Sequence, residues 1–318
     1  MRYIIVIKWL NISFLVLALA FSVDARAQYD AAFAHYFDME TSFNPAAVGK
    51  ESKLNFTGAY AMDLAGFEHN PNTMYAAADM PFIFMNGTHG AGLQFINDKL
   101  GLFNHMRISL QYAKKQKLFG GTLSVGVQAG LLSEKFDGSE LDLNDASDPA
   151  FASSQIEGNS ADISAGIYYQ HGRWYVGASA LHLTAPTVEL GEKNELKVDR
   201  SYWLTAGYTF KMRNPFISFK ASALGRTDLT AYRADVTGRL MYNNDTKHFY
   251  AGLSYSPTNS VTVLVGGEVQ GITLGYSYEV YTSAINPGNG SHELFVGYQT
   301  DINLVKKGKN LHKSVRIL

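Results

Sequence analysis

Residues 122–132 read TLSVGVQAGLL, and their side chains alternate between two characters along the whole stretch. Leu123 and Val125 would share one face of an extended strand, whereas Ser124 and Gln128 would share the opposite face. One face therefore suits an apolar environment, and the other suits water or a polar lumen. This pattern predicts a β-strand in the wall of a transmembrane barrel or in a water-soluble β-sandwich.

The same alternation recurs in about fourteen segments of roughly 8 to 11 residues each. An even number of strands close to this length is typical of an antiparallel outer-membrane β-barrel. We therefore expect an all-β fold with a single barrel domain. The predicted strands lie at 54–62, 72–80, 90–98, 105–113, 122–132, 161–169, 174–183, 201–210, 216–225, 232–242, 249–256, 261–269, 272–281 and 292–300.

The first 27 residues have the three parts of a secretory signal peptide. Arg2 and Lys8 form a basic region, residues 9–21 form an apolar stretch, and residues 25–27 read Ala-Arg-Ala. The apolar stretch is too short for a transmembrane helix. The sequence predicts removal of residues 1–27 and export of the mature chain.

The composition agrees with an exported barrel. The 318 residues include 19 Tyr, 19 Phe and 29 Gly but no Cys, and the mean hydropathy is only −0.09. Only one face of each barrel strand meets lipid, so a moderate hydropathy is expected. Without cysteine the chain has neither disulfides nor thiolate metal sites. Removing the signal peptide leaves a net charge of about −3, which gives no reason to expect a nucleic-acid partner.

The connections between the predicted strands favour a barrel over a sandwich. Long connections at 133–160, 184–200 and 282–291 all follow odd-numbered strands, while the longest connection after an even strand covers 81–89. Short periplasmic turns opposite long outer loops are typical of outer-membrane barrels. If the barrel starts in the periplasm, these three long loops lie outside the cell.

Charged residues inside the predicted strands indicate a polar lumen. Arg233, Asp235 and Arg239 lie on one face of their segment, opposite Tyr232 and Val236. An arginine facing lipid costs about 2 to 4 kcal/mol near the membrane centre, so we expect this row to face the lumen. Ion pairs that fill the barrel and a solute-selective pore are both compatible with it.

The acidic loop 136–149 is a candidate calcium site. It contains four oxygen-bearing side chains, those of Asp142, Asn144, Asp145 and Asp148. The loop lacks the ligand spacing, the central glycine and the closing glutamate of an EF-hand. A solvated outer loop is the simpler interpretation, and we expect no bound metal.

Evidence for catalysis is equally weak. His292 and Ser254 could in principle belong to a hydrolase site at one rim of the barrel. No GxSxG or comparable signature accompanies them. The sequence therefore predicts a protein that is not an enzyme and has no cofactor.

Several stretches resemble, in the same order, segments of a known family. Residues 44–49 read NPAAVG, residues 90–103 read GAGLQFINDKLGLF, and residues 291–302 read SHELFVGYQTDI. These stretches resemble the PorP/SprF family of outer-membrane proteins, which is associated with type IX secretion in Bacteroidetes. The residues that carry the resemblance are Asn44, Pro45, Gly49, Gly90, Gly92, Asn97, Asp98, Gly101, His292 and Glu293.

The resemblance implies a non-enzymatic part in type IX secretion, in which the protein helps to export or anchor cargo at the cell surface. In some family members the cargo is a gliding adhesin. The implied partners are the periplasmic and outer-membrane secretion components, the cargo and the lipid bilayer. An outer-membrane solute channel or a transporter of hydrophobic compounds is the alternative function.

The chain divides into four parts on these criteria. A signal peptide covers 1–27 and the barrel covers 51–303. Between them, residues 28–50 are too polar and too kinked for a strand. We expect them to fold back into the periplasmic mouth or the lumen as a plug anchored by Phe33, Tyr36 and Phe37, and a disordered lead-in is the alternative. Residues 304–318 form a basic periplasmic tail, which could bind an anionic partner or simply remain solvated.

Overall fold

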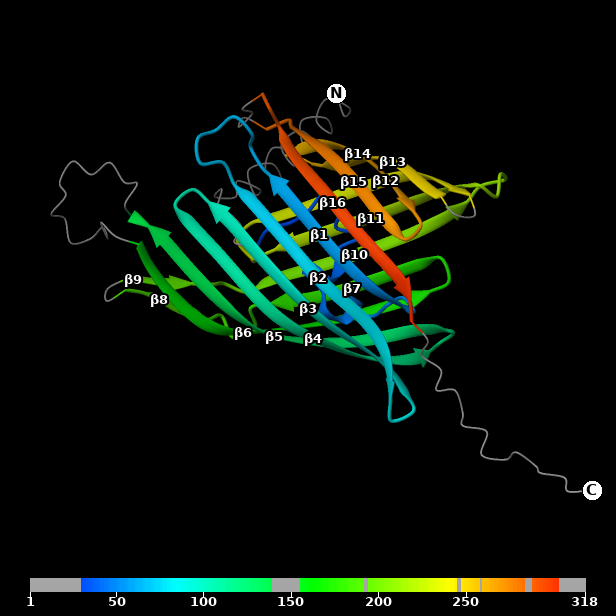
Figure 1. Cartoon of the computed structure of the whole chain (residues 1–318), viewed down its shortest axis with the longest axis horizontal. Helices are drawn as coiled ribbons and strands as arrows, with labels where there is room; N and C mark the ends of the chain where they lie inside the picture. Colours follow the sequence, from blue (N-terminus) through cyan, green and yellow to red (C-terminus); the bar gives the residue numbers. More distant parts are fainter. Residues whose placement is uncertain are drawn as a thin grey trace, which may run out of the picture.

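The computed structural model is a closed barrel of antiparallel strands, in which β1 pairs with β16 to complete the wall (Figure 1). It describes residues 30–138, 155–191, 194–244, 247–257, 259–283 and 288–302. Every barrel strand pairs with its sequence neighbours, so the wall is a simple meander. The wall strands are β1 (Lys53–Met62), β2 (Asn72–Phe84), β3 (Gly87–Leu100), β4 (Phe103–Leu118), β5 (Gly121–Asp137), β6 (Gln155–His171), β7 (Trp174–Leu181), β10 (Ser201–Lys211), β11 (Ile217–Thr227), β12 (Tyr232–Asn244), β13 (Lys247–Ser256), β14 (Ser260–Val269), β15 (Ile272–Tyr281) and β16 (Ser291–Asp301).

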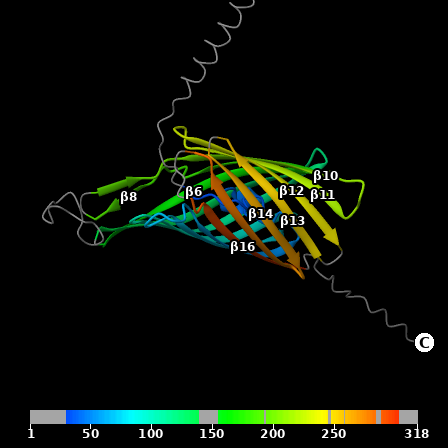
Figure 2. The same cartoon turned by 90° about the horizontal axis from the view of Figure 1, so that it is seen from above.

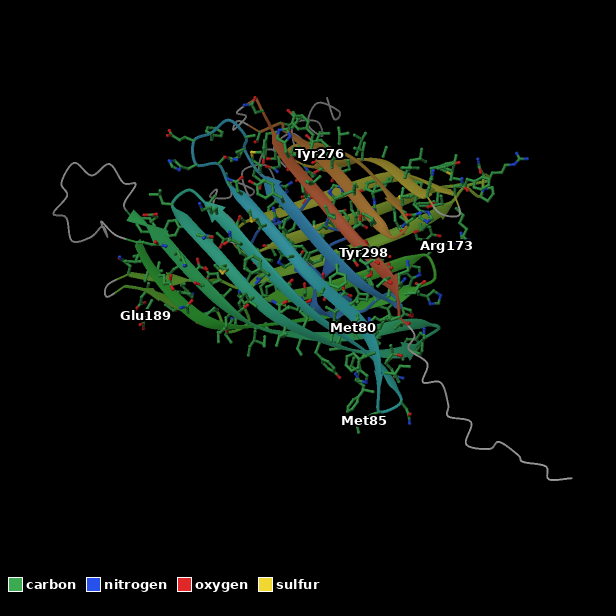
Figure 3. The ribbon with its side chains drawn as sticks, in the orientation of Figure 1. Met80, Met85, Arg173, Glu189, Tyr276 and Tyr298 are labelled. Carbon is green, nitrogen blue, oxygen red and sulfur yellow. The ribbon has the colours of Figure 1, made fainter. Side chains whose placement is uncertain are left out.

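The barrel has two distinct ends. At the turn end, where β1 begins and β16 ends, β2 and β3 are joined by only two residues, 85–86. At the opposite end, here called the loop end, residues 182–200 connect β7 to β10. The expected long connection at 81–89 is therefore wrong, because β2 and β3 continue through most of it. Met85 and Arg173 lie at the turn end and Glu189 lies at the loop end (Figure 3).

Several strands exceed the expected length. β4 has 16 residues and β5 and β6 have 17 each, so the connection expected over 133–160 shortens to 138–154. The strand ends at 114–117 and 133–137 are polar apart from Phe136. Alternation is visible only where one face is apolar, so the sequence pattern fades where a strand leaves the membrane.

Side chains alternate between the lumen and the outer surface along each strand. On β10, for example, Trp203 is 4% exposed and its neighbour Leu204 is 58% exposed. Tyr298 and Met80 project from the outer wall (Figure 3). An apolar outer band bordered by aromatic residues is the surface that lipid requires. Aromatic side chains that border this band include Phe56, Tyr112, Trp174, Phe210, Phe249 and Tyr298 toward the turn end and Tyr60, Tyr202, Tyr232 and Tyr255 toward the loop end.

The connection from β7 to β10 contains a hairpin of its own. Strands β8 (Thr187–Leu190) and β9 (Asn194–Lys197) form a separate two-stranded sheet beside the extended ends of β5 and β6. Its apolar side chains, including Val188 and Leu190, pack on Leu132 in a small core. This core lies beyond the barrel and stiffens a connection that the sequence predicts only as a loop.

No helix in the described part of the chain is long and apolar enough to cross a membrane. The predicted signal peptide, the calcium-site residues of the acidic loop and the basic tail lie outside the described residues.

Candidate functional site

The lumen is occupied by the chain's own residues 30–50, here called the N-terminal segment. These residues, dark blue in Figures 1 and 2, run inside the wall. Asp30 contacts His182 and Ser201 at the loop end, and Lys50 precedes β1 at the turn end. They contain two short 3₁₀ turns, η1 (Glu40–Ser42) and η2 (Pro45–Ala47). The aromatic side chains of Phe33, Tyr36 and Phe37 are each at least 95% buried. Residues from almost every side of the barrel therefore surround a compact, non-strand peptide.

The Asn-Pro pair folds the middle of the segment. Asn44 caps η2, because its Oδ1 accepts a hydrogen bond from the Ala46 amide at 2.9 Å, and Pro45 begins the turn with a preset φ. The Asn44 Nδ2 donates to the Ile167 carbonyl of β6 at 3.1 Å. A Cβ added at Gly177 would lie 2.9 Å from that Nδ2, so β7 needs glycine opposite the cap. The cap thus ties the segment to two wall strands.

Glycines accommodate the end of the segment as it leaves the lumen. Gly49 has φ +60°, and its amide donates to the Asp79 carboxylate of β2 at 2.7 Å. A Cβ on Gly92 of β3 would lie 2.9 Å from Val48, and a Cβ on Gly90 would collide with the Val48 carbonyl. Side chains at these wall positions would therefore push the segment out of its seat.

Glu293 holds the first half of the segment to β16. Its carboxylate accepts hydrogen bonds from the amides of Ala34, at 2.6 Å, and His35, at 3.0 Å. The same carboxylate lies 2.6 Å from the His35 Nδ1, and the ring stacks on Phe295 with centroids 5.5 Å apart. The His35 ring is fully buried. One buried carboxylate therefore binds three donors on the segment.

Asp30 fixes the segment at the loop end. Its carboxylate contacts the His182 Nε2 at 3.0 Å and the Arg107 guanidinium at 3.3 Å, and it accepts a hydrogen bond from Ser201. Burial opposes the charge of Asp30, but His182 and Arg107 outweigh it and lower the pKa of this carboxyl. Burial likewise opposes a proton on His182, and the carboxylates of Asp30 and Asp162 outweigh it, raising the pKa of His182 to about 9. At neutral pH the contact is therefore an ion pair.

The row of charges on β12 contributes to the same lumen. Arg233 pairs with Asp235 at 3.0 Å and with Glu279 of β15 at 2.9 Å. The Arg239 guanidinium lies 3.2 Å from the ring centroid of Phe37, a cation–π contact with the N-terminal segment. These arginines are thus occupied by contacts inside the protein.

Two polar cavities remain on either side of the segment. The loop-end cavity has a volume of about 280 Å³ and is lined by Asp63, Asp98 and Arg233 among others. Burial and the nearby Glu279 carboxylate raise the pKa of Asp63 to about 7. The turn-end cavity has a volume of about 370 Å³, with Lys220 and Arg239 in its wall. The segment separates the two spaces.

The residues singled out from the sequence divide into two groups. The first lies in the N-terminal segment or contacts it, and comprises Asn44, Pro45, Gly49, Gly90, Gly92, Glu293 and Arg239. The second lies elsewhere. Asp98 accepts a hydrogen bond from Thr73 at 2.6 Å, Asn97 neighbours it on β3, and Gly101 has φ +61° in the turn to β4. His292 faces outward, with its Nδ1 2.7 Å from the Tyr276 hydroxyl.

The candidate hydrolase pair does not form a site. Ser254 is buried in the lumen, where it accepts a hydrogen bond from Thr237 at 2.8 Å, whereas His292 is on the outer face of the wall. Among the residues that the structure describes, no three His, Asp or Glu side chains are grouped so that they could hold a metal ion. The lumen side chains described above instead contact the N-terminal segment.

The residues that hold the segment and that sequence reasoning missed include Asp30, His35 and Asp79. Asp30 and His35 precede the Asn-Pro pair in a stretch without recognisable periodicity, and their partners are about 80 to 260 residues away. The sequence could have indicated that Asp79 faces the lumen, because its carboxylate lies on the polar face of the predicted strand that begins with Asn72.

Comparisons with known proteins identify one family. The model of a family described as type IX secretion system membrane protein PorP/SprF matches residues 25–298. No curated protein matches the chain. Among solved structures, a Pseudomonas aeruginosa FadL homologue is 12% identical over 82% of this chain and 93% of that chain, with a TM-score of 0.46. The CymD monoaromatic hydrocarbon channel is 10% identical over 82% of this chain and 91% of that chain, with a TM-score of 0.49. The family match covers the N-terminal segment and nearly the whole wall.

Proposed function

Because the chain belongs to the PorP/SprF family of type IX secretion system membrane proteins, we propose that it is a non-enzymatic docking component of that system in the outer membrane. In this role it helps to export cargo proteins or adhesins, or anchors them at the cell surface. Its partners are the periplasmic and outer-membrane secretion components and the cargo itself.

The occupied lumen is the observation that favours docking over conduction. Barrels of about 8 strands are filled by their own side chains, whereas those with 16 to 18 strands leave an aqueous channel. This barrel has 14 strands, and its central space holds the N-terminal segment. Hydrogen bonds to the segment come from Glu293, Asp79, Gln111 and Ser124 on different strands. In our proposal the segment is a permanent plug.

Docking then uses the surfaces at the two barrel ends. We assign the loop end to the cell surface, so that the connections over 138–154 and 182–200 face the cargo. The turn end and the tail at 304–318 face the periplasmic machinery. The β8–β9 hairpin supports this assignment, because a small packed core holds it in place and Glu189 on it is exposed.

Site-specific crosslinking in cells tests the docking proposal. A photoreactive residue at Glu189 should crosslink to a secreted or surface-anchored protein. Leu253, a lipid-facing side chain on β13, provides the matched control position and should give no such product. If Glu189 yields no protein adduct while secretion proceeds normally, the hairpin is not the cargo surface.

The two polar cavities favour one other function, a solute channel that opens when the segment moves. Planar-bilayer recordings separate the two functions. The plugged barrel should carry little steady current, and deletion of residues 30–49 should open it to ions. A large steady current through the unmodified protein would support the channel instead.

A further inference from the structure

Two neighbouring turns at the turn end carry three exposed cationic side chains. Arg173 is on the turn between β6 and β7, while Lys211 and Arg213 are at the turn between β10 and β11. The turns are adjacent, because the Thr209 amide donates to the Arg173 carbonyl at 2.8 Å. We call these three residues the basic rim. Arg173 is labelled at this end in Figure 3.

The basic rim differs from the lumen cations in its ion pairing. None of its three side chains forms an ion pair with a carboxylate in the part of the chain that the structure describes. The turn residues themselves, Gly172 and 212–216, include no Asp or Glu. Inside the lumen, by contrast, cations such as Arg233 and Lys50 are paired with carboxylates. The rim is therefore an unneutralised positive patch.

Outward-facing aromatic side chains lie directly beside the rim. Trp174 pairs with Tyr208 across β7 and β10, and both are about 40% exposed. Phe210 precedes the second turn on the outer face of β10 and is 47% exposed. Half-exposed aromatic residues mark the depth at which lipid headgroups meet the hydrocarbon. The three cations thus lie at the depth of the headgroup phosphates.

We infer that the basic rim binds the phosphate of an anionic phospholipid in the leaflet at the turn end. Arginine forks and a lysine ammonium are suited to phosphate oxygens, and the adjacent aromatic surface suits the start of the acyl chains. Binding of an acidic protein would require only the cations, and it would leave the lipid-facing aromatic side chains without a role. Arg173 and Arg213 lie in turns next to the outward-facing Trp174 and Phe210, and this arrangement favours lipid.

Lipid binding to the purified full-length protein tests the inference. Native mass spectrometry would measure retention of phosphatidylglycerol and phosphatidylcholine from mixed micelles. The unmodified protein should prefer phosphatidylglycerol, and the triple variant Arg173→Gln, Lys211→Gln, Arg213→Gln should bind it about tenfold more weakly or worse. A loop-end triple variant, Lys99→Gln, Lys197→Gln, Arg200→Gln, removes the same charge and should retain the preference.

Two further measurements keep the result interpretable. A heat-dependent shift in gel mobility would show whether the triple variant still forms the barrel, and the single variant Arg213→Gln substitutes for it if it does not. Equal retention of the two lipids by the unmodified protein, or equal losses in both triple variants, would overturn the inference. Tight rim-dependent binding of polyglutamate without a preference for phosphatidylglycerol would instead indicate an acidic protein partner.

Discussion

Glu293 is a buried carboxylate whose three donors all belong to the N-terminal segment. Replacing it by glutamine, as in Glu293→Gln, keeps the shape but removes the charge that these donors require. Hydrogen bonds to charged groups contribute about 1.5 to 3 kcal/mol each, so we expect the variant to lose about 2 kcal/mol of unfolding free energy. Urea unfolding of the protein in lipid vesicles would measure the loss.

The neighbouring residue provides the control for this variant. His292→Gln alters the same strand on the outer face, where the ring contacts Tyr276 and Tyr278. It should leave the N-terminal segment in place and change stability by less than about 1 kcal/mol. If both variants lost similar amounts of unfolding free energy, Glu293 would stabilise the barrel strand and not the N-terminal segment.

Gly90 tests how closely the segment fits the wall. In Gly90→Ala the new methyl group would collide with the Val48 carbonyl, and we expect a loss of about 1 to 3 kcal/mol together with faster proteolysis of residues 30–50. In Gly58→Ala the nearest atom is 3.8 Å away, so that variant should match the unmodified protein. Unchanged proteolysis in Gly90→Ala would contradict the fit.

The motif residues could be predicted from the sequence, but the reason for their importance could not. Asn44 and Pro45 were recognisable as a compact turn. Their partners Gly177 and Ile167 are more than 120 residues away, and nothing in a local pattern connects them. Gly90 and Glu293 both contact the N-terminal segment only because the wall closes into a barrel.

At the scale of the elements, alternation located all fourteen wall strands, because one face of each meets lipid. It failed where the environment changes. Strands β4 to β6 continue past the alternating stretch with mostly polar residues, and β8 and β9 are only four residues long. The N-terminal segment has no period at all, since its side chains contact the wall on every side.

The end of that segment should respond to pH. The raised pKa of His182, about 9 against 6.5, means that its pair with Asp30 stabilises the fold fully below pH 6.5. This contribution is lost as the pH rises through about 9 and amounts to at most about 3 kcal/mol. Arg107, Asp162 and Arg226 are further charged groups that contact the pair, Arg226 through the Asp30 carbonyl.

Urea unfolding at pH 7 and pH 10 would test this effect. The unmodified protein should lose more stability between the two values than His182→Asn, which lacks the titrating ring. Equal losses in the two proteins would show that the pair is not the pH-dependent contact.

At the scale of the whole molecule, the absence of cysteine allows its orientation to be tested directly. We expect Leu229→Cys, at the loop end, to react with a membrane-impermeant thiol reagent in intact cells. Met85→Cys, at the turn end, should react only after the outer membrane is permeabilised (Figure 3). The reverse pattern would place the loops in the periplasm and contradict the assignment of the docking surfaces.

The central claim is that this plugged barrel serves protein secretion by docking. Quantitative mass spectrometry of surface and medium proteins, comparing a strain that lacks the chain with its parent, tests it most directly. We expect loss of secreted proteins from the surface and medium, either broadly or for one large surface protein, and recovery when the chain is restored. An unchanged surface and medium proteome would contradict a role in secretion.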